Sequence, residues 1–230
     1  MANYLLVSFK TCPWVQRAAI VLREKNIDFE FRHIEPDNRP EWFLAISPHK
    51  KVPVLRIDDT VSLFESNAIA EYLDETIAPR LHPADPVARA VNRAWTDYVP
   101  DFASAVTATA YADNEADYSK AAGKIPGAFE RLEQALAKRG SGPYFNGSNY
   151  SLVDAAYAPF LQRYYFLDRV KPLSVIERFP QLKAWSDALL ARPSTHSFPP
   201  AEFEAMYRAN LRRRNKWVSQ FVAPAQVAAE

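Results

Sequence analysis

The first 34 residues alternate between strand-like and helix-like patterns of apolar side chains. Residues 3–9 (NYLLVSF) form a short apolar run typical of a buried strand. Apolar side chains then recur at helical spacing over residues 15–22, with Pro13 suited to the first turn and Asn26 to the end. Residues 29–33 alternate as a second strand does. This β-α-β order favours parallel strands joined by a right-handed crossover.

The next segment completes a small mixed unit. Residues 40–45 fit a short helix. Two apolar runs, residues 54–57 and 61–64, are separated by three polar residues, which predicts a hairpin. Residues 66–77 again show helical spacing. The predicted element order is therefore βαβαββα.

A change of pattern follows at Pro79, Pro83 and Pro86, whose close succession is typical of a linker. Beyond them we find only helical patterns, at residues 88–111, 118–138, 152–166, 182–191 and 201–217. Ser151 to Asp154 resembles a helix capping box with Asp in place of the usual Glu.

The predicted fold class is α/β plus all-α. We expect a first domain at residues 1–79, a linker at 80–87 and an all-helical domain at 88–230. The last twelve residues (SQFVAPAQVAAE) are expected to be frayed at the surface.

Composition excludes several classes of function. The 230 residues carry 28 Lys and Arg against 27 Asp and Glu, so the net charge gives no sign of a nucleic-acid or membrane partner. No stretch approaches the length of a membrane span, and the N-terminus is too short in apolar length for a signal peptide. A single cysteine fits a reducing compartment. We expect a cytoplasmic protein.

Phosphate-binding and metal sites are also not expected. With 5 glycines, the chain contains neither of the Gly-rich phosphate-binding loops. The histidines are too scattered for a recognisable metal motif, at His33, His49, His82 and His196. We therefore predict no metal.

Cys12 is the strongest candidate for chemistry. It lies between a predicted strand and a predicted helix, directly before Pro13. The N–H groups and dipole of a helix N-terminus favour a thiolate, so we expect the pKa of this thiol to be lowered. The alternative is a small buried apolar residue without a chemical role.

The absence of a second cysteine limits the kinds of thiol chemistry that the chain can perform. A dithiol site needs another Cys three residues on, and Val15 occupies that position. Once Cys12 has formed an adduct, only an external thiol can release it, and glutathione is the abundant candidate. The pattern favours monothiol chemistry.

Several segments, taken in order, resemble the cysteine-type cytosolic glutathione S-transferases, above all the omega class. They are TCPWVQR at 11–17, NRPEWF at 38–43, KVPVL at 51–55, FES at 64–66 and EYLD at 71–74, with the capping segment at 151–154. The resemblance implies a thioredoxin-like first domain and an all-helical second domain. It also implies glutathione as co-substrate and a homodimer.

The resemblance also implies a set of glutathione-binding residues. Val52 precedes what the family has as a cis-proline, Pro53, and its backbone would pair with the cysteinyl part of glutathione. Glu65 would meet the α-ammonium group, Ser66 the γ-glutamyl carboxylate and Arg39 the glycyl carboxylate. The alternatives are a plain strand entry at Lys51–Pro53, simple helix capping by Ser66 and a solvated loop charge at Arg39.

A second-substrate pocket is expected between the domains. Trp14, Tyr111 and Tyr165 are the aromatic residues we predict to line it. Thr11 is a rival to Cys12, as a hydroxyl donor to the thiol of glutathione. A basic run near the C-terminus fits either a solvated face that pairs with other helices or an anion site, and comprises Arg208, Arg212, Arg213, Arg214 and Lys216.

The predicted function is glutathione-dependent thiol transfer or reduction. Cys12 would form a mixed disulfide with glutathione, and the partner would be an electrophilic, disulfide or glutathionylated small molecule. Two alternatives remain open: a binding or regulatory protein that keeps this fold without catalysis, and a specialised glutathione-dependent lyase or dehalogenase.

Overall fold

A four-stranded mixed sheet forms the centre of the first domain. The computed structural model describes residues 2–222. The strands are β1 (Tyr4–Ser8), β2 (Glu30–His33), β3 (Val54–Ile57) and β4 (Val61–Phe64), in the spatial order β2-β1-β3-β4. β1 pairs parallel with β2 and antiparallel with β3, and β3 pairs antiparallel with β4. Both the parallel pair and the hairpin predicted from the sequence are confirmed.

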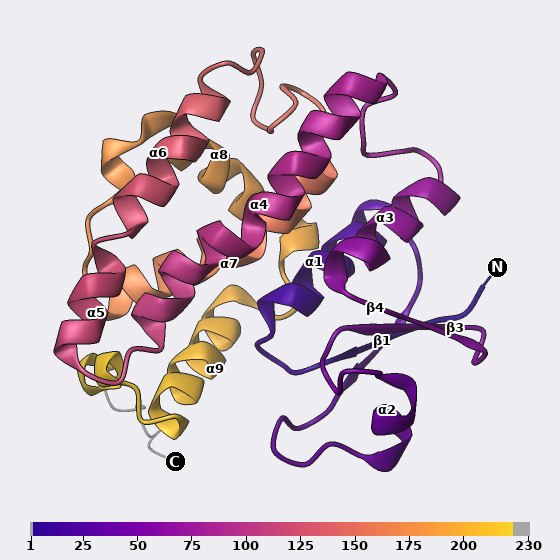
Figure 1. Cartoon of the computed structure of the whole chain (residues 1–230), viewed down its shortest axis with the longest axis horizontal. Helices are drawn as coiled ribbons and strands as arrows, with labels where there is room; N and C mark the ends of the chain where they lie inside the picture. Colours follow the sequence, from indigo (N-terminus) through magenta and orange to yellow (C-terminus); the bar gives the residue numbers. More distant parts are fainter. Residues whose placement is uncertain (1, 223–230) are drawn as a thin grey trace.

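Three helices complete this domain: α1 (Pro13–Glu24), α2 (Glu41–Ile46) and α3 (Ser66–Thr76). α1 and α3 lie on the face of the sheet that looks toward the second domain, and α2 lies on the other side (Figure 1). The apolar side of α1 is wholly buried, which is what its spacing of apolar residues predicts. Asn26 follows its end with a positive φ of 52°. Asn tolerates this left-handed conformation better than most residues, which makes it a suitable helix stop.

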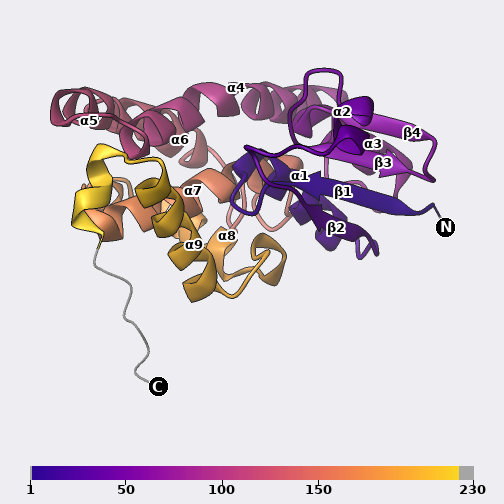
Figure 2. The same cartoon turned by 90° about the horizontal axis from the view of Figure 1, so that it is seen from below.

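The second domain is built from helices alone. They are α4 (Pro86–Ala110), α5 (Glu115–Ala122), α6 (Ile125–Leu136), α7 (Leu152–Val170), α8 (Pro180–Ala191) and α9 (Pro200–Arg213), with the 3-10 turns η1 (Ile176–Arg178), η2 (Pro193–Thr195) and η3 (Trp217–Phe221). Seen from below, the two domains lie side by side, with α1 against α7 at their junction (Figure 2). The predicted fold class, a thioredoxin-like domain followed by an all-helical domain, is confirmed.

Some predicted helix limits are wrong. The helix expected over residues 118–138 is two helices, because the chain breaks at Gly123 and Lys124 before α6 begins at Ile125. The helix expected over 201–217 ends at Arg213, and η3 follows as a separate turn. α4 begins inside the predicted linker, at Pro86. Of the predicted frayed tail, residues 219–221 belong to η3, and residues 223–230 lie outside the described part of the chain.

The predicted capping box at the start of α7 is confirmed. The backbone N–H and the hydroxyl of Ser151 both donate to Asp154, at 2.8 and 2.7 Å. The same buried carboxylate accepts from the backbone N–H of Phe145 at 2.8 Å and from the indole of Trp185 at 2.6 Å. Asp154 therefore fixes the start of α7 relative to both the preceding loop and α8.

A buried ion pair ties the chain between the domains to the first domain. Lys25 lies 3.0 Å from Asp74, and both side chains are shielded from solvent. Lys25 also donates to the carbonyls of Ile77 and Pro79, while Asp74 accepts from the backbone N–H groups of Leu81 and His82. These bonds hold the segment that leads into α4.

Candidate functional site

The register of the sheet gathers four loops at one of its ends. Ser8 pairs with His33 in the parallel ladder, Val7 pairs with Val54, and Val54 pairs with Phe64. The segments after β1, after β2, before β3 and after β4 therefore meet there. In chain order these segments carry Cys12, Arg39, Val52 with Pro53, and Glu65 with Ser66. The thiol and the residues predicted to bind glutathione are thus brought to the same end of the sheet.

Cys12 is the residue directly before α1. It caps the helix with an extended backbone, φ −73° and ψ 118°, and Pro13 occupies the first helical position. Its backbone N–H donates to the carbonyl of Phe9 at 3.1 Å, and its own carbonyl accepts the N–H of Gln16 at 3.2 Å. These bonds fix the turn between β1 and α1. The thiol is free and half-buried.

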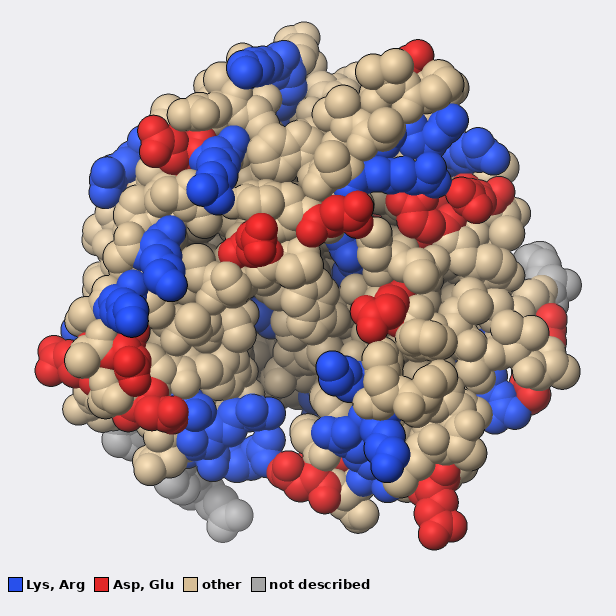
Figure 3. All heavy atoms as spheres, viewed as in Figure 1, with Lys and Arg blue, Asp and Glu red and all other residues tan. Residues whose placement is uncertain are grey.

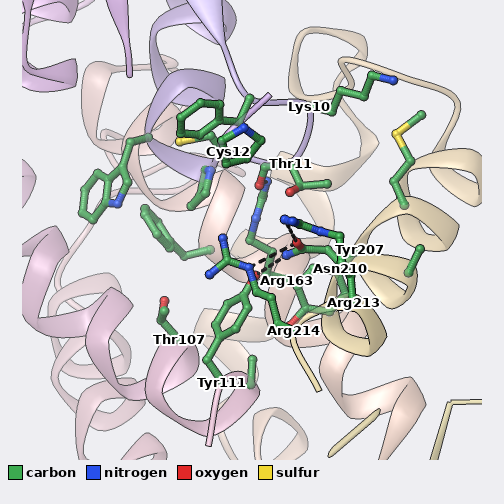
Figure 4. Close-up of a pocket in the computed structure, with 18 of the residues that line it drawn as sticks. Lys10, Thr11, Cys12, Thr107, Tyr111, Arg163, Tyr207, Asn210, Arg213 and Arg214 are labelled. Carbon is green, nitrogen blue, oxygen red and sulfur yellow. Dashed lines mark hydrogen bonds between the residues drawn. The ribbon is translucent and has the colours of Figure 1, made fainter. Parts of the chain in front are cut away.

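The thiol borders a cavity of about 760 Å³ between the two domains. Figure 3 shows a hollow in this face of the molecule with Lys and Arg side chains on its lower rim. The first domain contributes the segments after β1 and β2, and the second contributes α4, α7 and α9. In the close-up, Cys12 and Thr11 lie toward one end and Tyr111 toward the other, with Arg163 and Arg214 between them (Figure 4). This volume is typical of small-molecule sites.

The pKa of the Cys12 thiol is raised, not lowered. Burial is the largest cause, because it penalises the charged form. The backbone N–H of Val15, the charge of Arg163 and the N–H of Trp14 act in the opposite direction. The prediction of a lowered pKa is therefore wrong on balance. The helix N-terminus does favour the thiolate, but desolvation outweighs it.

Arg163 of α7 is the second key residue at the thiol. Its Nη2 donates to the carbonyl of Thr11 at 2.9 Å, and its Nη1 donates to Gln16 Oε1 and to the carbonyl of Pro159, both at 2.7 Å. The guanidinium also lies 5.2 Å from the centre of the Phe203 ring. Burial lowers the pKa of Arg163 to about 10, so the group is charged at neutral pH.

Gln16 connects the same helix to the second domain. Its amide nitrogen donates to Gln162 Oε1 at 2.9 Å and to the carbonyl of Thr195 at 2.7 Å. Its oxygen accepts from Arg163. One side chain of α1 is thereby bonded to both α7 and η2, and the residues beside the thiol are held from both domains.

The predicted glutathione-binding residues are not among those that line this cavity. Arg39 donates to the carbonyls of Pro36 and Lys50, and its guanidinium lies 5.6 Å from the ring centre of Phe9. Glu65 has a positive φ of 65°, and its carboxylate is 2.9 Å from His49 Nε2.

Two further predicted glutathione-binding positions lie close by. The peptide bond between Val52 and Pro53 is cis. Ser66, the first residue of α3, is buried. Their part in binding glutathione stays a prediction.

Two of the three predicted pocket aromatics line the cavity. Trp14 and Tyr111 do so. Tyr165 does not, because its hydroxyl points to α8 and donates to Asp187 at 3.2 Å. The neighbouring positions on α7 that reach the cavity are Phe160 and Arg163.

Sequence reasoning missed several residues of the cavity. They are Phe160, Arg163, Tyr207 and Asn210. The sequence does contain one indication of Arg163, which is the single charged residue between Asp154 and Asp168 in a largely apolar helix. A charge in such a stretch calls for a specific partner.

The basic run near the C-terminus pairs in part with other elements, and part of it borders the cavity. Arg208 pairs with Glu204, and Lys216 pairs with Asp113, each at 2.6 Å. Arg213 and Arg214 instead line the cavity, although Arg213 also pairs with Asp37 at 2.5 Å. Arg212 donates to the carbonyl of Val222.

Comparison with known proteins agrees with this geometry. A family model described as the N-terminal domain of glutathione S-transferase matches residues 6–80, and one for the C-terminal domain matches residues 88–188. The chain is 32% identical to glutathione S-transferase U28 of Arabidopsis thaliana, over 93% of this chain and 95% of that protein. The chain belongs to the glutathione S-transferase family.

Other relatives of this glutathione S-transferase come from different classes. It is 31% identical to glutathione S-transferase omega-1 of Sus scrofa, over 81% of this chain and 76% of that protein. The solved structure of rice GST1 in complex with glutathione superposes with a TM-score of 0.80 and 27% identity, covering 92% of this chain and 97% of that one. The protein is therefore a glutathione-dependent transferase, whereas the omega-like, cysteine-type assignment belongs to the proposal below.

Two further observations describe the rest of the glutathione S-transferase. Within residues 2–222, no helix combines the length and the apolar character that crossing a bilayer requires. In the same part of the chain, no three His, Cys, Asp or Glu side chains gather where a metal ion could be held.

Proposed function

We propose that this glutathione S-transferase is an omega-like thiol transferase or glutathione-dependent reductase in which Cys12 forms a mixed disulfide with glutathione. One observation carries the proposal. The single thiol of the chain borders the cavity between the domains, at the same end of the sheet as the residues that resemble a glutathione site.

The reaction needs two exchanges at sulfur. The Cys12 thiolate attacks the glutathione sulfur of a mixed disulfide between glutathione and a small thiol. The substrate S–S bond breaks, the Cys12–glutathione bond forms, and the small thiol leaves as a thiolate that takes up a proton. A second glutathione thiolate then attacks the adduct, releasing Cys12 thiolate and glutathione disulfide. The substrate disulfide is reduced and two glutathione molecules end in one disulfide.

The absence of a resolving cysteine supports the second step. The 230 residues contain no other thiol, so the adduct on Cys12 can leave only by attack from outside the chain. The first glutathione would be held by the residues at the end of the sheet. Val52 next to the cis-proline Pro53 would pair with its backbone, and Glu65, Ser66 and Arg39 would bind its charged ends.

Positive charge and oriented N–H groups at the thiol support a reactive sulfur despite its burial. Arg163 and the N–H groups of Val15 and Trp14 favour the thiolate against desolvation. The same groups would stabilise negative charge on sulfur while the S–S bond breaks. Arg163 also fixes the carbonyl of Thr11, the residue before the thiol, and so acts as a positioning residue.

The experiment measures reduction of a glutathione mixed disulfide in the presence of glutathione. Cys12→Ser should lose activity to near the uncatalysed rate, and a mass increase of one glutathione should be trapped on the wild-type chain but not on the variant. Thr11→Ala serves as the matched control, because it removes the rival hydroxyl and should keep most of the activity.

Other outcomes separate the alternatives. Full activity in Cys12→Ser with loss in Thr11→Ala would favour hydroxyl-assisted conjugation and overturn the mechanism. Binding to immobilised glutathione without thiol transfer would favour a lyase or dehalogenase. If the protein neither binds immobilised glutathione nor shows thiol-transfer activity, the result would favour a binding protein.

We also propose a homodimer that resides in the cytoplasm. Exposed apolar side chains on both domains support the dimer, at Val61 and Phe64 of β4 and at Val87 and Val91 of α4. Sedimentation of the wild type against Phe64→Glu tests it, since a charge at this contact should shift the equilibrium toward monomer.

A further inference from the structure

The cavity beside Cys12 carries more positive than negative charge. Four cationic side chains and the carboxylate of Glu35 belong to its wall. Arg213 is neutralised by its ion pair with Asp37. Among the described residues, the other three cations have no carboxylate partner, and they are Lys10, Arg163 and Arg214.

Arg214 is held in place by neutral groups. Its Nε donates to Asn210 Oδ1 at 3.3 Å, and its guanidinium carbon lies 5.4 Å from the ring centre of Tyr111. Tyr111 in turn accepts from the amide nitrogen of Asn210 at 2.9 Å. The terminal nitrogens of Arg214 make no hydrogen bond within residues 2–222, and Figure 4 places the side chain in the cavity. A guanidinium fixed in this way presents a fork suited to a carboxylate.

Arg163 adds a buried charge to the same space. Its hydrogen bonds go to three uncharged oxygens. A buried cation without an anion is costly, so an anionic ligand in the cavity would offset part of that cost.

The wall also offers an unused hydroxyl and aromatic rings. Tyr207 of α9 is 2% exposed, and its hydroxyl has no hydrogen-bond partner among the described residues. Trp14 and Phe160 pack edge to face at 4.8 Å between ring centres and line the cavity near the thiol. The cavity thus combines an apolar aromatic part with a cationic part.

We propose that the second substrate is an anionic aromatic compound, bound with its ring against Trp14 and Phe160 and its carboxylate on Arg214. In terms of the proposed function, on which this inference rests, the small thiol released from glutathione is an aromatic thiol bearing a carboxylate. Lys10 and Arg163 add attraction without being required to contact it.

A matched pair of substrates tests the charge. One is the mixed disulfide of glutathione with 4-mercaptobenzoate, and the other is the mixed disulfide with 4-mercaptobenzamide, which keeps the shape and removes the charge. Rates are divided by the uncatalysed rate for each disulfide. We expect kcat/KM for the carboxylate to exceed that for the amide by about fivefold to tenfold, as a charge-assisted hydrogen bond implies. Added salt should reduce this ratio.

Two arginine variants locate the effect. Arg214→Gln should bring the ratio close to one, because it removes the guanidinium that faces the carboxylate. Arg178→Gln, at an exposed arginine of η1 away from the cavity, should leave the wild-type ratio unchanged.

Equal kcat/KM for the two substrates in the wild type would overturn this inference and leave the proposed function standing. A wild-type preference that survives in Arg214→Gln would also overturn it. Failure of the wild type to turn over either disulfide would instead overturn the proposed function.

Discussion

The guanidinium of Arg163 on α7 is bonded to the carbonyl of Thr11, the residue directly before the thiol, at 2.9 Å. The bond crosses the boundary between the two domains. It places a charge from the helical domain beside Cys12 of the thioredoxin-like domain, where its field favours the thiolate. The thiol environment is therefore shared between domains and is not a property of the strand–helix turn alone.

Removing this charge should make Cys12 less reactive. Arg163→Met keeps a long apolar side chain but loses the cation, so the pKa of the thiol should rise. A loss of about 1.4 kcal/mol of thiolate stabilisation would slow alkylation by iodoacetamide at pH 7 about tenfold. The measurement is the alkylation rate against pH, whose midpoint should move upward.

Two controls separate charge from folding. Arg163→Lys keeps the cation, so its midpoint should lie nearer to the wild type than that of Arg163→Met. Arg178→Met makes the same change at the surface and should not move the midpoint. If the midpoint of Arg163→Met equals that of the wild type, the role given to this residue is wrong.

Neutralising Glu65 should weaken the binding of glutathione and have a smaller effect on the rate of the chemical step. If its carboxylate meets the α-ammonium group, Glu65→Gln loses a charge-assisted bond and the KM for glutathione should rise about tenfold. The kcat should change much less, because the contact is made equally in ground and transition states. Glu41→Gln, at an exposed acid on α2, is the matched control. An unchanged KM would remove Glu65 from the proposed site.

Breaking the buried pair of Lys25 and Asp74 should destabilise the chain strongly. Asp74→Ala leaves a buried ammonium without its counter-charge and two backbone N–H groups without an acceptor. Loss of one partner of such a pair costs about 3–5 kcal/mol. Urea denaturation measures the change. Lys183→Ala breaks the exposed ion pair with Asp187 and should hardly alter the urea midpoint. An equally small effect of Asp74→Ala would contradict this prediction.

Acid should remove a stabilising contribution from Glu71. Burial alone would favour its neutral form, but hydrogen bonds from His82 and Arg93 lower the pKa of Glu71 to about 2. A depressed folded-state pKa stabilises the folded chain above the unfolded value of 4.5, and this contribution is lost as pH falls from there toward 2. Because Arg93 is largely exposed and solvent screens the pair, the contribution is on the order of 1 kcal/mol.

The matched variant is Glu71→Gln. Urea denaturation measures its stability and that of the wild type at several pH values from 7 to 3. The variant should be less stable than the wild type at pH 7, and the gap should narrow as the pH falls. If the difference in stability between the two proteins stays constant over this pH range, the pKa of the Glu71 carboxyl is not lowered in the folded chain.

Much of the first domain could be predicted from sequence because strands and helices impose periods on apolar residues. The order βαβαββα and the hairpin follow from that pattern, and the segment TCPWVQR placed the thiol at a helix start. The break at Gly123 and Lys124 could not be seen, since apolar residues continue at helical spacing on both sides.

The parts of the site that escaped prediction depend on tertiary structure. The raised pKa of Cys12 comes from burial in the folded chain, which no local sequence pattern reports. Tyr165 and Arg163 both belong to α7, but they project in different directions, one to α8 and the other to the cavity. The angular position of a helix around its axis decides between such residues, and it is fixed only by packing.

The bond between Arg163 and Thr11 also limits how this protein can be recombined with its relatives. A chimaera that keeps the thioredoxin-like domain and takes its helical domain from another member would gain that member's pocket. It would keep the electrostatic setting of Cys12 only if the incoming helix presents a guanidinium at the same turn. Where the incoming helix lacks that guanidinium, exchange of the helical domain would alter substrate choice and thiol chemistry together.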